Sequence, residues 1–265
     1  MRSAAVRASE QMILTAALRT AERSGLFDSL ARVYATFERT TCDSCARCCF
    51  ESPGVFFVEY LRLVKLLDEM PQPQRQTLLR RAMGELFFSW IDPNRTCIFL
   101  DGANRCSIYE QRPLACRLFG FVAPSDRETA EVEARMSARE EARRLARLGI
   151  TIPEEIVTRS LVSCDRVRDT QGRPVRHVDA DDLAARVARL DEALLPREVV
   201  LREFCFRSLP DRLGAARLGA ETVETMRIQL LQRAQSGERV EDLVREVLEA
   251  VRSERTAQAR RSRTA

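Results

Sequence analysis

Residues 42–49 read Cys42-Asp-Ser-Cys45-Ala-Arg-Cys48-Cys49, and this stretch decides the fold class that the sequence predicts. Three further cysteines, each in polar or turn-forming sequence, are Cys97, Cys106 and Cys116. A buried structural cysteine behaves as a small hydrophobe and has no reason to recur at intervals of three. Thiolates separated by two residues can bind one metal ion or one corner of a metal cluster without strain. The stretch therefore predicts a soft-metal site on a loop or short turn.

Disulfide bonds are the alternative for these cysteines, and the sequence argues against them. The nine cysteines are an odd number, and two of them, Cys48 and Cys49, are neighbours. The apolar run 12–18 is bracketed by Glu10 and Arg19, which does not suit a secretory signal. Clustered cysteines in a cytosolic chain indicate a metal site or a catalytic site more often than disulfides. A redox disulfide relay remains the main competing interpretation.

The composition is that of a soluble globular protein. The 265 residues are enough for one large or two small domains, with 45% hydrophobic and 31% charged residues. No apolar run approaches the roughly 20 residues that cross a bilayer, so we expect no membrane span and a cytoplasmic location. A net charge of +4 is too small to indicate nucleic-acid binding.

Apolar residues at helical spacing predict a mainly α protein, with a small irregular or hairpin-containing, cysteine-rich metal-binding segment. We divide the chain into N-terminal helices (1–39), a cysteine-cluster metal-binding domain (40–121) and a C-terminal helical region (122–265). The first helical stretch has a predicted break at Gly25. The predicted helical stretches are 9–39, 60–67, 74–90, 127–148, 153–163, 180–194, 197–209, 220–235 and 238–255.

Two local signals place the later cysteines. The short apolar runs 97–100 and 105–109 flank the turn signal Asp101-Gly102, which predicts a small hairpin that brings Cys97 and Cys106 near each other. Pro113 suits the first turn of a helix that carries Cys116, because its missing N–H is not needed there.

Zinc and an iron–sulfur cluster are both compatible with thiolate ligands. The first three cysteines match the C-x-x-C-x-x-C spacing of bacterial ferredoxins, whose remaining ligand is remote in sequence. A second C-x-x-C pair, common in structural zinc sites, is missing, and this favours iron–sulfur slightly. The side chains of Cys48 and Cys49 are expected to diverge, so one of the two is expected to finish the first site. The metal and the number of centres stay open.

The first cysteine run, together with the segment Cys106-Ser-Ile-Tyr-Glu-Gln-Arg-Pro-Leu-Ala-Cys116-Arg117, resembles the YkgJ-type cysteine-cluster family. That family is described as a zinc- or iron-chelating domain, and the resemblance covers residues 41–121. It implies that all seven cysteines of the motif are metal ligands, and that four more motif residues have roles not yet assigned. The metal ligands implied are Cys42, Cys45, Cys48, Cys49, Cys97, Cys106 and Cys116, and the motif residues are Tyr109, Arg112, Pro113 and Arg117.

Within that motif, Tyr109 and Arg112 suit hydrogen bonds to cluster sulfurs or to a substrate group, and Arg117 is a third candidate for contact with the cofactor. A tight structural turn is the equal alternative. The flagellin lysine N-methylase looks similar in its cysteine cluster, and this resemblance implies that a protein-modifying enzyme is possible.

Four residues outside the motif were considered as further ligands or cofactor contacts. Cys164 and Cys205 lie in sequence expected to be helical, where a core thiol is the simpler interpretation. His177 is the sole histidine, in a polar loop, which argues against a zinc site built on several histidines. Trp90 ends an apolar helix and is expected in the core.

The sequence thus predicts a cytoplasmic protein that holds a 4Fe–4S cluster or zinc through cysteine thiolates, in an accessory or redox role. The alternative is a metal-dependent enzyme that modifies a protein side chain, resembling the lysine N-methylase. Both functions imply a protein partner or a protein substrate. A substrate cleft beside the cysteines favours the enzyme, and a closed four-cysteine site favours the accessory role.

Overall fold

The structure, a computed structural model, describes residues 4–41, 45–50, 52–92, 94–159, 164, 166–195 and 207–261. It is mainly helical, as predicted from the sequence. The α-helices are α1 (Ala4–Arg23), α2 (Leu26–Tyr34), α3 (Phe57–Glu69), α4 (Gln72–Phe88), α5 (Leu114–Leu118), α6 (Pro124–Ala146), α7 (Glu154–Val157), α8 (Ala180–Glu192), α10 (Leu209–Leu218), α11 (Ala220–Gln235) and α12 (Val240–Arg261).

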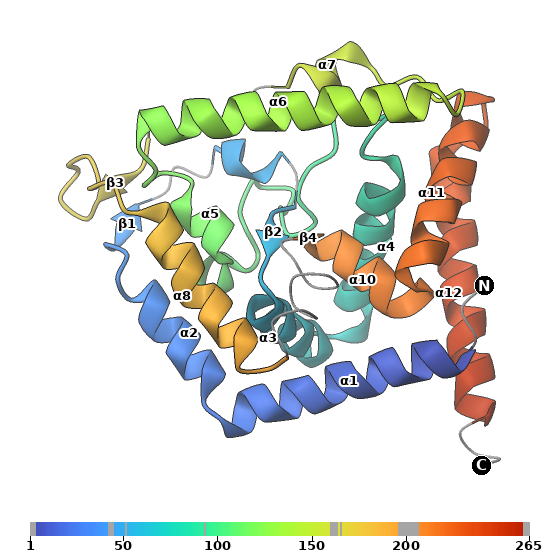
Figure 1. The fold of residues 1–265 in the computed structure, drawn as a ribbon, viewed down its shortest axis with the longest axis horizontal. Helices are drawn as coiled ribbons and strands as arrows, with labels where there is room; N and C mark the ends of the chain where they lie inside the picture. Colours follow the sequence, from blue (N-terminus) through green and yellow to red (C-terminus); the bar gives the residue numbers. More distant parts are fainter. Residues whose placement is uncertain are drawn as a thin grey trace.

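The longer helices form a frame around a helical centre (Figure 1). In this view α6 crosses the top and α1 the bottom, while α2 and α8 lie along one side and α11 and α12 along the other. Helices α3, α4, α5 and α10 lie inside the frame. Among the described residues, α4 contacts α10, α11 and α12, which makes it the helix around which the C-terminal helices pack.

Two antiparallel pairs of two-residue strands join distant parts of the chain. Strand β1 (Thr40–Thr41) pairs with β3 (Arg168–Asp169), and β2 (Gly54–Val55) pairs with β4 (Arg207–Ser208). The sequence did not predict these strands, because two residues are too few to show an alternating pattern. Their effect is to fasten both ends of the first cysteine run to the C-terminal half of the chain.

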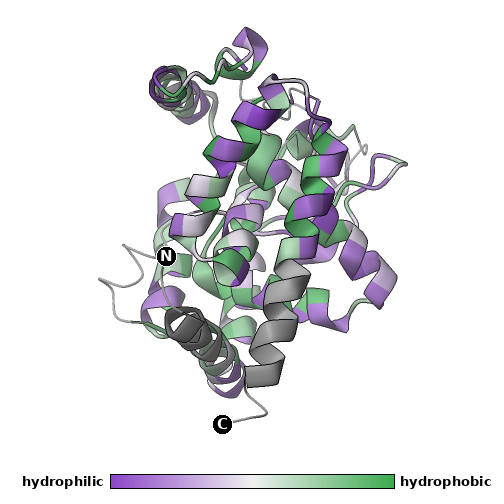
Figure 2. Ribbon diagram, turned by 90° about the vertical axis from the view of Figure 1, so that its right-hand side faces the viewer, coloured by the Kyte–Doolittle hydropathy of each residue, from purple (hydrophilic) through white to green (hydrophobic). Residues whose placement is uncertain are grey.

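One cluster of buried side chains runs through the centre of the molecule. Its largest fully buried members include Phe57 of α3 and Phe87 and Phe88 of α4. Figure 2 shows hydrophilic residues on the outward faces of the helices and hydrophobic residues toward the centre. Within the described residues, no helix has the length and apolarity that crossing a membrane requires.

Most helices lie where their periodicity predicts them, and two do not. The predicted break at Gly25 is confirmed, since this glycine has a φ of 63° between α1 and α2. In the helix predicted over 153–163, α7 ends at Val157 and residues 158–159 are not helical, while residues 160–163 lie outside the described part of the chain. In the predicted helix 197–209, residues 197–206 lie outside the described part of the chain, and 207–208 form β4. Helix α10, which begins at Leu209, was not predicted.

The N-terminus of α3 is held by a buried acid from a distant helix. Asp191 of α8, 1% exposed, accepts hydrogen bonds from the backbone N–H groups of Phe57 and Val58, each at 2.7 Å. The first N–H groups of a helix have no partner within the helix, so a buried helix start needs acceptors of this kind. Asp191 therefore fixes where α3 begins and how α8 packs on it.

Replacing Asp191 with asparagine is expected to destabilise the fold by about 1–3 kcal/mol, because an amide presents one acceptor oxygen where the carboxylate presents two. One of the two buried N–H groups then loses its partner. The measurement is urea-induced unfolding followed by circular dichroism. The exposed Asp68, replaced by asparagine, is the control, and equal stabilities of the two variants would contradict the capping role.

Candidate metal centre

The described end of the first cysteine run forms one turn of 3-10 helix over Arg47–Cys49. Ala46 before it has a φ of 58°, an uncommon value for a residue with a Cβ, and the N–H of Cys49 donates to the Ala46 carbonyl at 2.8 Å. The carbonyl of Cys49 in turn accepts from the N–H of Cys97 at 2.8 Å. This backbone bond joins two cysteines that are far apart in the sequence.

The predicted hairpin between Cys97 and Cys106 is confirmed in a minimal form. Leu100 and Cys106 form an isolated antiparallel bridge, and the N–H of Asp101 donates to the carbonyl of Arg105 at 2.8 Å. The carboxylate of Asp101 accepts from the N–H groups of Ala103 and Arg105, both at 2.8 Å, and so closes the turn.

Cys116 lies on the short helix α5, which begins directly after Pro113 as predicted. Proline occupies the position before the first helical residue, and the N–H of Leu114 donates to the Glu59 carboxylate at 2.6 Å. Glu59 is 2% exposed and also accepts from the hydroxyl of Tyr34. Burial raises the pKa of this carboxyl group, and the hydrogen bonds oppose that shift. Helix α5 is therefore anchored to α3 and α2 through one buried acid.

These elements bring five of the seven predicted ligands to one cavity of about 350 Å³. Its walls also include apolar groups such as Phe99 and Ile108, together with three of the predicted motif residues, Tyr109, Arg112 and Pro113. The cysteines that line it are Cys48, Cys49, Cys97, Cys106 and Cys116. Cys48 and Cys49 of the first run therefore share a cavity with the three later cysteines, while Cys45 is not among the residues that line it.

Burial raises the pKa of two of these thiols. It raises the pKa of Cys97 to about 12 and that of Cys116 well above its ordinary value, and the neighbouring cysteines add to the rise at Cys116. The positive charge of Arg112 works in the opposite direction on Cys116. Several thiols whose ionisation is unfavourable thus lie in one small space. A metal cation bound there would stabilise the thiolates, because it replaces their protons.

The side chains of the two adjacent cysteines were expected to diverge, and in the structure they do not. The sulfur atoms of Cys48 and Cys49 lie 3.7 Å apart, because the 3-10 turn lets both side chains face the cavity. A hydrogen bond between them lowers the pKa of Cys48 and raises that of Cys49. Both sulfurs can therefore reach the same centre.

The contacts of the three other motif residues, Tyr109, Arg112 and Arg117, are those of a tight turn. The guanidinium of Arg112 stacks on the ring of Tyr109, 3.6 Å from its centroid, and its Nε donates to the Tyr109 carbonyl at 2.9 Å. Arg117 donates from Nε to the carbonyl of Arg112 at 2.8 Å and stacks over the ring of Tyr34 at 4.2 Å. Of the two interpretations left open by the sequence, these contacts favour the structural turn, while Tyr109 and Arg112 also line the cavity.

Cys164 has a different environment from the predicted one. It is half-buried and lies outside any helix, so its predicted helical setting is wrong. Burial raises the pKa of its thiol, and interactions with Cys45 and Cys48 raise it further, which places it near the first cysteine run. The preceding Arg159 stacks over the Phe50 ring at 5.7 Å, and this contact carries the segment back to that run.

Cys42 and Cys205 lie outside the described residues. Within the described part, no three His, Cys, Asp or Glu side chains are close enough together to hold a metal ion. The five thiols thus share a cavity without surrounding one point in it. Among the described residues that line the cavity, the donors are thiol sulfurs with no histidine or carboxylate, and this donor chemistry fits zinc or an iron–sulfur cluster.

The other residues outside the motif lie away from the cysteine cavity. His177 is exposed in the chain between β3 and α8. Trp90 is half-buried; it packs against the core on one side and lines a second, larger cavity on the other.

Two buried polar residues at the site, Ser52 and Glu85, were not predicted from the sequence as site residues. Ser52, 5% exposed, has its hydroxyl 3.7 Å from the Cys97 sulfur and donates it to the Glu85 carboxylate at 2.6 Å. Glu85 is 7% exposed although it is charged. Its position in the run Gly84-Glu85-Leu86-Phe87-Phe88 was the available signal, because a single acid inside an apolar helical stretch is unusual.

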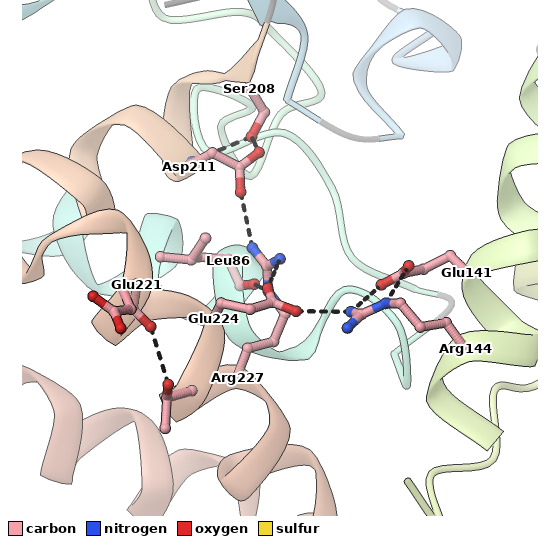
Figure 3. Close-up of polar contacts among 9 residues, drawn as sticks. Leu86, Glu141, Arg144, Ser208, Asp211, Glu221, Glu224 and Arg227 are labelled. Atoms are coloured by element: carbon pink, nitrogen blue, oxygen red, sulfur yellow. Dashed lines mark hydrogen bonds and ion pairs between the residues drawn. The ribbon is translucent and has the colours of Figure 1, made fainter. Parts of the chain in front are cut away.

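The second cavity, of about 570 Å³, lies beneath α6 and has Ser52 and Glu85 in its wall. Figure 3 shows the ion pairs that attach α6 to the helices on the other side of this cavity. Arg144 of α6 bonds Glu141 and also Glu224 of α11, at 2.8 Å, and Arg227 bonds Asp211 of α10 at 2.9 Å. Ser52 lines the larger cavity and contacts Cys97, which lines the cysteine cavity, so the two cavities are neighbours.

Residues 41–142 match the sequence model of a family described as "CxxCxxCC: Putative zinc- or iron-chelating domain". The match includes all seven cysteines of the motif and extends through most of α6. This part of the chain is therefore similar to a metal-chelating domain of the class that the cysteine spacing predicts. Searches of the curated proteins and of the solved structures each gave no match.

Proposed function

We propose that this protein binds an iron–sulfur cluster, or alternatively zinc, through the clustered cysteine thiolates, and that it serves an accessory or redox role in the cytoplasm. The observation that carries the proposal is the cavity lined by five cysteines from three separate segments. Cys42 and Cys45 of the same motif are further candidate ligands. The similarity to the YkgJ-type family supports the same class of site.

The cluster is the form of metal that we favour. The C-x-x-C-x-x-C spacing is that of ferredoxins, and adjacent Cys48 and Cys49 that face one cavity suit a centre larger than one ion. A volume of about 350 Å³ corresponds to roughly ten waters of about 30 Å³ each. When bound, a cluster supplies electron transfer, while zinc supplies a structural link or a Lewis acid.

The deciding experiment is anaerobic purification of the full chain, followed by metal and sulfide analysis and a visible absorption spectrum. Iron and acid-labile sulfide in equal amounts, with broad visible absorption, support the cluster. Zinc alone, with no visible absorption, supports the zinc site. A protein that contains neither metal and cannot be reconstituted with either contradicts the proposal.

Metal binding is expected to strengthen as the pH rises. Each thiol that becomes a ligand loses a proton, and burial holds the pKa of Cys97 near 12 and that of Cys116 above its ordinary range. If two protons are released, the apparent affinity rises by about 100-fold for each pH unit, and it falls equally as the pH is lowered. Competition of the apo-protein with a chelator between pH 6 and pH 8 measures this slope, after correction for the chelator's own protonation. A flat profile would mean that neutral groups hold the metal.

An enzyme that modifies a protein side chain is the second candidate function. The observation that favours it is the larger cavity, about 570 Å³, whose wall includes Ser52 and Glu85 next to Cys97. A substrate group in that cavity lies beside the cysteine site. The resemblance to the lysine N-methylase indicates the reaction class, with a protein as the expected substrate. If the protein instead has the accessory role, a protein is the expected partner.

Blocking the larger cavity separates the two functions. Ala138 of α6 lines the cavity, so Ala138→Trp is expected to fill it, while Val132→Trp on the exposed side of the same helix (58% exposed) is the matched control. If the protein is the enzyme, the metal-loaded wild type transfers a labelled methyl group from a methyl donor to a lysine-rich protein, and Ala138→Trp abolishes the transfer with full metal content. No transfer by the wild type favours the accessory role.

A further inference from the structure

The backbone around Cys97 is held by one face of α4. Arg81 donates from Nη2 to the Cys97 carbonyl at 2.7 Å and from Nη1 to the Leu100 carbonyl at 2.6 Å. Glu85, four residues further on, lies on the same face of the helix. The N–H of Cys97 is already bonded to Cys49. Both backbone polar groups of Cys97 therefore have fixed partners.

The sulfur of Cys97 is held from the same helix through one intermediate residue. Glu85 accepts from the Ser52 N–H at 2.7 Å and lies 2.6 Å from the Ser52 hydroxyl. The hydroxyl also lies 3.7 Å from the Cys97 sulfur, so the Glu85 carboxylate and the sulfur are alternative acceptors of its one proton, and a Cys97 thiolate accepts it from Ser52. The Ser52 oxygen accepts from the N–H of Ile98 at 3.3 Å. Hydrogen bonds of this kind set the direction in which a ligand atom points.

We infer that Ser52 and Glu85 are positioning residues of the metal centre, which orient the Cys97 sulfur toward the metal, and that Arg81 holds the backbone beneath it. This inference rests on the proposed metal-binding function. A purely structural role is the competing explanation, because an acid that bonds the backbone of a loop also stabilises the fold. Outer residues that orient metal ligands typically contribute about 10- to 100-fold to metal affinity.

The test uses cobalt(II) titrations of the full-length apo-protein, because Co²⁺ binds thiolate sites and the thiolate–cobalt absorption reports directly on the sulfurs. Ser52→Ala removes the hydroxyl beside Cys97, and Glu85→Gln replaces one acceptor of Ser52 with a donor. Each is expected to weaken Co²⁺ binding by about 10- to 100-fold and to change the thiolate–cobalt band. Ser52→Thr keeps a hydroxyl and is expected to restore binding to within about threefold of the wild type.

Asp191→Asn is the matched control, because Asp191 is also a buried acid that accepts two backbone hydrogen bonds, and among the described residues those bonds come from Phe57 and Val58 at the start of α3. It is expected to lower stability and leave the Co²⁺ affinity and the absorption band unchanged. Ser52→Ala and Glu85→Gln proteins that bind Co²⁺ like the wild type would overturn the positioning role alone. A wild-type protein that binds no metal would overturn the proposed function and this inference with it.

Discussion

Replacing Cys97 with serine is expected to lower the metal affinity by at least about 100-fold. Thiolate sites of four cysteines bind zinc with about 10–16 kcal/mol, or roughly 3 kcal/mol for each ligand, and a serine hydroxyl does not replace a thiolate for a soft metal. Cys97 is 5% exposed and lines the cavity together with four other cysteines, so no solvent ligand reaches its position easily. Metal content after anaerobic purification and chelator competition measure the loss.

Ile98→Val is the control for this substitution. Ile98 follows Cys97 in the same loop and is fully buried, so its truncation costs about 0.5–1.5 kcal/mol of stability without removing a thiol. The control is expected to retain a full equivalent of metal. If Cys97→Ser also retained it with unchanged affinity, Cys97 would not be a ligand, and the centre would depend on the other cysteines.

The sequence was sufficient for the parts of the site that local chemistry determines. The hairpin of Cys97 and Cys106 follows from a turn signal between two short apolar runs, and the start of α5 follows from Pro113. The long helices follow from periodic burial of their apolar residues. These features depend on neighbours in sequence, which is why a single sequence indicates them.

The features of the fold that the sequence did not predict depend on contacts between residues that are far apart in the chain. The strand pairs β1–β3 and β2–β4 have two residues in each strand and no pattern of their own. The apolar residues after α7 suggested a longer helix, but Arg159 packs on Phe50 and the chain returns to the first cysteine run. Tertiary contacts of this kind override local helix propensity. The bond between Ser52 and Glu85 could be suspected from the isolated acid in α4, but its partner could not be named.

Removal of the metal is expected to expose the cysteine loops to protease while leaving the helices of the core intact. Within 94–118, regular structure amounts to one 3-10 turn over Tyr109–Gln111 and the short helix α5, so this stretch depends on its side-chain contacts for order. Burial of protonated thiols in a shared cavity stabilises the loops less than a bound metal does. Metal ligation cross-links the three segments and so closes long loops. Helices α3 and α4 keep their own apolar contacts, with Phe57 and Phe87 fully buried.

Trypsin distinguishes these two regions because arginine occurs in both. Arg105, whose side chain is 70% exposed at the tip of the hairpin, is expected to be cleaved much faster in the apo-protein than in the metal-loaded protein. Arg80, in the helical backbone of α4, is expected to resist cleavage in both forms. Mass spectrometry of timed digests gives the two rates, and circular dichroism of the same samples is expected to show that most helix is retained. Equal cleavage at Arg105 with and without metal would mean that the loops are ordered by the protein alone, and that the cysteines form a preorganised site from which metal can exchange.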